Sequence, residues 1–211
     1  MTSAVLIMLF AMTLIYTSVV SRIEAYIKMI SAQGFLLFLI AITDIISDGQ
    51  LRSTGTMIIA VETLGLKTLL IPWYMMRVIR ENEITREGEP YVPHFASLIV
   101  VTLICVIGIL PFALMDGPPP LFFGAAFAAV GTGFFIIISR KSLISHVNGY
   151  IIIENGIFLL SLGVAKDMPF IVSMGVSLDI FLGIFLAGVF VKRIKGTFDK
   201  DHIDSLTDLK D

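Results

Sequence analysis

The chain has 211 residues, of which 56% are apolar and 15% are charged, and its formal net charge is −2. This share of apolar residues excludes an ordinary soluble domain. The near-neutral charge gives no sign of nucleic-acid binding. The single cysteine, Cys105, excludes a disulfide framework within the chain and a cysteine-ligated cluster. A redox centre would therefore belong to a partner.

Long apolar runs recur along the chain. A hydrocarbon core of about 30 Å requires about 20 apolar residues per helix, and runs of that size alternate with short polar breaks. We predict an all-α integral membrane protein of about seven transmembrane helices. The predicted spans are 2–20, 29–47, 56–77, 95–115, 120–138, 144–164 and 169–191. Residues 1–21 carry no charge, which favours a retained first helix over a cleavable signal peptide.

Lysine and arginine gather in alternate loops of this arrangement. One side collects Arg22, Lys28, Arg77, Arg80, Arg86, Arg140, Lys141, Lys192, Arg193, Lys195, Lys200 and Lys210. The other side has only Arg52 and Lys166. Because basic residues near helix ends stay on the cytoplasmic face, we predict an outer N-terminus and a cytoplasmic C-terminus.

We expect one membrane domain over residues 1–211. It comprises an N-terminal four-helix portion (1–115), a three-helix unit (120–192) and a cytoplasmic tail (193–211). The tail and the charged segment 77–93 are large enough to meet partner subunits.

Four charged residues lie away from the ends of the predicted spans: Glu62, Lys67, Glu154 and Asp179. A charge in hydrocarbon costs at least about 2.5 kcal/mol, and such residues usually mark ion or proton pathways. Glu154, Asp179 and Lys67 fall near the middle of their spans, while Glu62 falls nearer the outer face. They predict a proton relay. The alternative is a static buried pair that determines helix packing.

Glu62 and Lys67 are five residues apart, or about 140° around an α-helix. We therefore expect each side chain to face a different neighbour. Pro72 and Pro111 interrupt the backbone hydrogen bonds of their spans and predict kinks. His94 and His146 lie at cytoplasmic span ends, where interfacial or solvated histidines are favoured over metal ligands.

Small residues line one face of the fifth span. They are Gly124, Ala125, Ala128, Ala129 and Gly133. Small residues at this spacing allow transmembrane helices to approach closely. We interpret the face as a packing surface.

Two segments carry a family resemblance: Asn148–Gly156 (NGYIIIENG) and Met174–Gly183 (MGVSLDIFLG). They resemble the family of the E subunit of hydrogenase-4 and of related formate hydrogenlyase-type complexes, and the likeness covers most of the chain. The last three helices of that family resemble the K subunit of respiratory complex I, which carries one acid in each of two adjacent helices. Glu154 matches the first acid and Asp179 the second. This chain differs in having Asp in the last helix and an additional four-helix portion.

The resemblance implies a non-catalytic subunit of a larger oxidoreductase in a bacterial or archaeal cytoplasmic (inner) membrane. Its partners would be antiporter-like membrane subunits and a peripheral cytoplasmic arm with iron–sulfur and nickel–iron centres, while this chain would hold no cofactor or metal. Glu154 and Asp179 would exchange protons, flanked by Lys67 and Glu62. Two alternatives stay open: a structural scaffold without ion movement, and a stand-alone transporter or channel. Either H⁺ or Na⁺ suits the carboxylates.

Overall fold

The computed structural model describes residues 2–47, 61–81, 90–115 and 118–164, together with the single positions 175, 179, 182 and 183. Every regular element in these ranges is a helix, so the all-α prediction is confirmed. The elements are α1 (Thr2–Val19), α2 (Ile23–Ser47), the π-helix η1 (Val61–Leu70), α4 (Ile71–Glu81), α5 (His94–Ala113), α6 (Pro118–Ser139) and α7 (Leu143–Val164).

Four of the described helices are long and apolar enough to cross a membrane. The spanning segments are Ile23–Thr43, His94–Ala113, Leu121–Ser139 and Ile144–Val164, and α1 adds the shorter apolar segment Ser3–Val19. The chain is therefore a membrane protein. Seven spans and the orientation stay predictions, since most of the last predicted span, 169–191, lies outside the described residues, as does the tail.

The chain divides into two compact units, Met1–Val176 and Ser177–Asp211. All the helices named above belong to the first unit. The predicted domain organisation stays a prediction.

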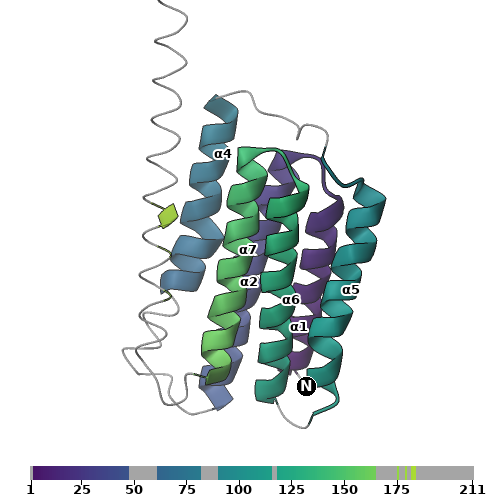
Figure 1. Cartoon of the computed structure of the whole chain (residues 1–211). Coiled ribbons are helices and arrows are strands. Elements are labelled where there is room, and N and C mark those ends of the chain that lie inside the picture. Colours follow the sequence, from purple (N-terminus) through teal and green to yellow (C-terminus); the bar gives the residue numbers. More distant parts are fainter. Residues whose placement is uncertain are drawn as a thin grey trace, which may run out of the picture. The chain divides into compact units, whose positions relative to one another are not determined.

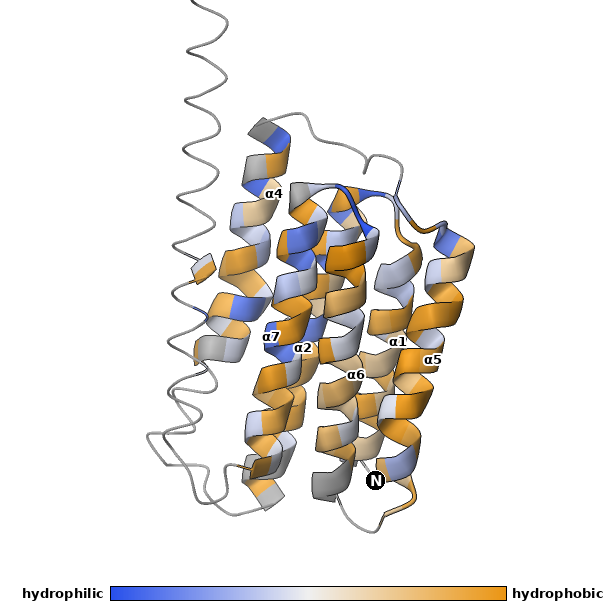
Figure 2. Cartoon of the chain, viewed as in Figure 1, coloured by the Kyte–Doolittle hydropathy of each residue, from blue (hydrophilic) through white to orange (hydrophobic). Residues whose placement is uncertain are grey.

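Within the first unit, α1, α2, α5, α6 and α7 form an elongated bundle (Figure 1). The α1–α2 turn, the α6–α7 loop and the start of α5 lie at the same end, which we call the Arg140 end. Two hydrogen bonds join these segments: the Tyr91 N–H donates to the Ser139 carbonyl over 2.9 Å, and the Arg140 guanidinium donates to the Ser18 carbonyl over 2.6 Å. Hydrophilic residues gather at this end and on parts of α2 and α7 (Figure 2).

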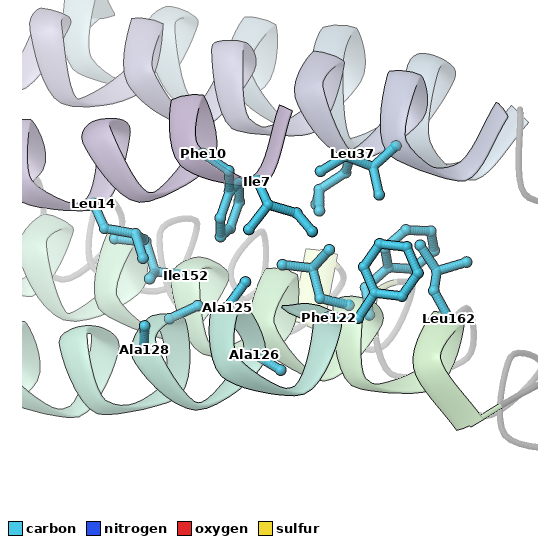
Figure 3. Packing of buried hydrophobic residues seen from close by; sticks show 14 of the residues in the cluster. Ile7, Phe10, Leu14, Leu37, Phe122, Ala125, Ala126, Ala128, Ile152 and Leu162 are labelled. Carbon is cyan, nitrogen blue, oxygen red and sulfur yellow. The ribbon is translucent and has the colours of Figure 1, made fainter. Parts of the chain in front are cut away.

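An apolar core fills the interior of the bundle. Figure 3 shows buried side chains of α1, α2, α6 and α7 meeting there. The labelled residues are Ile7, Phe10, Leu14, Leu37, Phe122, Ala125, Ala126, Ala128, Ile152 and Leu162. In a membrane, van der Waals packing of this kind is a main source of attraction between helices.

Glycines bring α6 into close contact with two neighbours. A Cβ on Gly133 would lie 2.5 Å from the Gly149 carbonyl oxygen of α7, and one on Gly124 would lie 3.0 Å from the Gly108 carbonyl oxygen of α5. Ala125, Ala128 and Ala129 on the same helix are buried. The small-residue face is thus a packing surface, which confirms the prediction.

Two described segments differ from their predicted bounds by more than two residues. α2 begins at Ile23, six residues before the predicted start at 29. Its charged Glu24 and Lys28 are exposed while Ile23 and Ile27 are buried, so an amphipathic turn extends the helix beyond the apolar run.

The third predicted span, 56–77, corresponds in its described part to η1 followed by α4, which continues to Glu81. Pro72 is the second residue of α4. A proline in the first turn of an α-helix removes an N–H that would have no partner within that helix.

Candidate functional site

Lys67 lies in the ten-residue π-helix η1. Hydrogen bonds of a π-helix join residues i and i+5, and the Thr68 hydroxyl repeats this spacing by donating to the Thr63 carbonyl over 2.7 Å. Positions 62 and 67 are therefore about one turn apart. The expected separation of about 140° assumed an α-helix and is wrong for this segment; the Glu62 side chain lies outside the described residues.

Helix α2 holds η1 at close range. A Cβ on Gly34 would lie 2.8 Å from the carbonyl carbon of Lys67 and 2.9 Å from the nitrogen of Thr68. Three residues earlier, the Ser31 hydroxyl donates to the Thr68 carbonyl over 2.7 Å. Because only glycine leaves room here, Gly34 determines how closely the backbone of Lys67 approaches α2.

The Lys67 side chain is buried, with 2% of its surface exposed. Its Nζ lies 4.7 Å from the centroid of the Phe158 ring on α7. An ammonium over an aromatic face is attracted by the ring quadrupole, and more strongly where water is excluded. This contact brings the Lys67 charge to α7.

Glu154 lies four residues before Phe158 on α7, and residues at this spacing are neighbours on one helix face. The structure therefore brings the Lys67 ammonium to the face of α7 that carries Glu154. Glu154 is 4% exposed, and neither of its carboxylate oxygens has a hydrogen-bond partner within the described part of the chain. A buried carboxylate in this setting is available to bind a proton or a cation.

A buried pair of amides joins α2 to α7 beside these residues. The Asn155 side-chain nitrogen donates to the Gln33 side-chain oxygen over 3.2 Å. Asn155 follows Glu154 in the chain and Gln33 precedes Gly34, so each amide adjoins one part of the site. Sequence reasoning missed this pair. The available signal was a polar amide within an otherwise apolar span.

Asp179 belongs to the second unit and is 2% exposed. Its burial agrees with a position inside a span. Its predicted partnership with Glu154 stays a prediction.

A second buried polar group lies at the Arg140 end. Arg140 is 1% exposed, and besides Ser18 its guanidinium lies 3.4 Å from Nδ1 of His94. Since guanidinium only donates, this contact requires His94 Nδ1 to accept. His146 Nε2 lies 2.9 Å from the Arg140 carbonyl oxygen and donates to it. Both histidines are half-buried at helix ends, as interfacial residues are.

Potential metal ligands do not gather in the described ranges. No group of three or more His, Cys, Asp or Glu side chains in this part of the chain is arranged to hold a metal ion.

Two kinds of curated protein are similar to this chain. An uncharacterized protein of Mycobacterium tuberculosis is 27% identical over 199 residues, covering 90% of this chain and 87% of that protein. Hydrogenase-4 component E of Escherichia coli K12 is 28% identical over 152 residues, covering 68% of both chains, and the protein of the same name from Shigella flexneri matches equally. No protein-family model and no solved structure matches the chain.

Proposed function

We propose that this chain is a membrane subunit of a hydrogenase-type oxidoreductase complex and that its buried charged residues carry protons or sodium ions. The similarity to hydrogenase-4 component E, which extends over 68% of both chains, supports the complex. The Lys67 ammonium over Phe158, one turn from the buried Glu154, is the observation that supports ion movement.

The proposed proton transfer depends on two opposite charges at one face of α7, the Glu154 carboxylate of that helix and the Lys67 ammonium that reaches it from η1. Glu154 binds a proton and becomes neutral; Lys67 releases one and becomes neutral. Proton transfer between such groups moves charge within the membrane without moving a helix, provided that each also exchanges protons with a neighbour. Glu62 and Asp179 are the proposed neighbours.

The proposed setting is a multi-pass subunit of a bacterial or archaeal inner membrane. Electrons would pass through iron–sulfur and nickel–iron centres of partner subunits, and antiporter-like subunits would continue the ion path. This chain would join the two parts without holding a redox centre of its own.

Glu154→Gln tests the proposal because it removes the charge and keeps the shape. We expect ion pumping by the complex in inverted membrane vesicles to fall on the order of 100-fold, the lower end for a positioned proton-transfer group. Electron transfer from the donor, and the set of co-purified subunits, should be unchanged. Glu24→Gln, the same change at an exposed position of α2, should leave both unchanged.

Normal pumping by an assembled Glu154→Gln complex would contradict the proposed ion path. Loss of co-purified subunits in that variant would favour the scaffold instead. Transport by the purified chain alone in liposomes would favour a stand-alone transporter.

A further inference from the structure

Helices α2 and α7 run in the same direction. The α6–α7 loop contains Arg140, which donates to the Ser18 carbonyl near the end of α1, and α2 begins directly after α1. Both α2 and α7 therefore start at the Arg140 end (Figure 1). The hydrogen bond between Gln33 and Asn155 sets their register.

Polar residues recur along this interface at a spacing of seven. One heptad before Gln33 and Asn155 lie Tyr26 on α2 and Asn148 on α7, and all four side chains are buried. Parallel helices in contact keep residues seven apart on the same side. We call these four residues the polar seam.

The polar seam occupies only one half of the interface. One heptad beyond Gln33 and Asn155 lie Ile40 and Leu162, both buried and apolar. Leu37 and Leu159 are buried nearby and belong to the same apolar core. At this heptad position the interface is therefore polar from the Arg140 end to the level of Gln33 and apolar beyond it, and Ile30 and Ile152 are buried between the two polar levels.

Several amide atoms of the polar seam have no hydrogen-bond partner among the described residues. They are both amide atoms of Asn148, Gln33 Nε2 and Asn155 Oδ1. A buried amide group left without a partner costs about 1–3 kcal/mol. In folded proteins such groups are usually satisfied by internal water.

We propose that the polar seam binds a chain of internal water molecules, which leads from the Arg140 end to Gln33 and Asn155 and stops there. Its inner end adjoins the charged site: Gly34 contacts the Lys67 backbone, and Glu154 precedes Asn155. The water chain supplies Glu154 with protons from one face of the membrane. This last role, but not the water chain, rests on the proposed function.

Cysteine accessibility in membrane vesicles tests the water chain directly. The native thiol is removed by Cys105→Ala, and single cysteines are introduced by Asn148→Cys and Leu159→Cys. Both positions are fully buried on α7, but Asn148 belongs to the polar seam and Leu159 lies one turn beyond its inner end. The probe is 2-(trimethylammonium)ethyl methanethiosulfonate, a permanent cation that does not cross the bilayer and that reacts with thiolates, so it needs water at the thiol.

We expect the cysteine at 148 to react at least about tenfold faster than the cysteine at 159, because only the former contacts water. Labelling should occur from one face only, when right-side-out and inverted vesicles are compared. Equal rates at the two positions, or equal labelling from both faces, would overturn the proposal. Gln33→Cys repeats the test from α2 if Asn148→Cys does not accumulate.

This experiment separates the two proposals. If the cysteine at 148 is unreactive and the Glu154→Gln variant cannot pump, the water chain is contradicted and the proposed function is supported. If labelling is rapid and one-sided and the Glu154→Gln variant pumps normally, the water chain is supported and the proposed function is contradicted.

Discussion

Two buried cationic groups among the described residues, Arg140 and Lys67, have contrasting surroundings. The Arg140 guanidinium meets the carbonyl of Ser18 in the last turn of α1, where the partial negative charge of a helix end favours a cation. The Lys67 ammonium lies over the ring of Phe158, and one turn before Phe158 on α7 is Glu154, whose carboxylate has no hydrogen-bond partner among the described residues. The first arrangement holds helix ends together; the second brings a cation to the face of α7 that carries a buried carboxylate.

Arg140→Leu should produce the largest loss of stability, because it removes a charged donor and leaves the Ser18 carbonyl buried. We expect the free energy of unfolding to fall by about 3 kcal/mol. Thermal unfolding in mild detergent, followed by size-exclusion chromatography, measures this. Arg22→Leu is the control, since Arg22 is exposed at the same end and its loss should matter by less than about 0.5 kcal/mol. Equal losses in the two variants would contradict an anchoring role.

Gly34→Ala should have an intermediate effect on the other region. The new methyl group would meet the Lys67 carbonyl carbon at 2.8 Å, so η1 must shift away from α2. We expect a loss of about 2 kcal/mol in stability and a pumping defect in complexes that still assemble.

Gly65→Ala is the matched control for that change. A Cβ at Gly65 would lie 3.9 Å from Val61 Cγ1, which is ordinary van der Waals contact. Pumping and stability should be close to those of the unmodified chain. Identical behaviour of the two alanine variants would show that the α2–η1 approach does not position Lys67.

Phe158→Leu should have the smallest effect, since leucine keeps an apolar side chain at this core position and removes the aromatic face beneath the ammonium. We expect about 1 kcal/mol less stability and a lower pumping rate, measured against electron transfer in the same vesicles. Phe122→Leu alters another buried aromatic residue in the apolar core and should reduce stability without altering the pumping ratio. A lower ratio of pumping to electron transfer in both variants would show that the effect of Phe158→Leu comes from packing alone.

Much of the fold was predictable because hydrocarbon imposes a simple requirement on sequence. Apolar length located the α5, α6 and α7 helices to within a few residues. The small residues of α6 indicated close packing because few other functions need glycine and alanine at that spacing. The early start of α2 was missed because its first turns are amphipathic rather than apolar.

The candidate site was predictable in part. Lys67 and Glu154 stood out because charge is rare in apolar spans. Gly34 and the Gln33–Asn155 pair did not stand out in the sequence, because their structural role depends on which neighbouring helix each residue faces. The π-helical geometry of η1 was also not predicted. Its sequence does not distinguish the i to i+5 hydrogen bonds of a π-helix from the i to i+4 hydrogen bonds of an α-helix.

Composition and apolar length were enough to establish a helical membrane protein and to single out the ionisable residues within its spans, since transfer from water to hydrocarbon depends on residue type. Helix packing, in contrast, determines that Lys67 reaches Phe158, that Asn155 meets Gln33, and that Arg140 is enclosed rather than solvated. The physical reason is that contacts between helices depend on rotation and depth. Those are set by close packing at positions such as Gly34 and Gly133, which the local pattern of one helix does not encode.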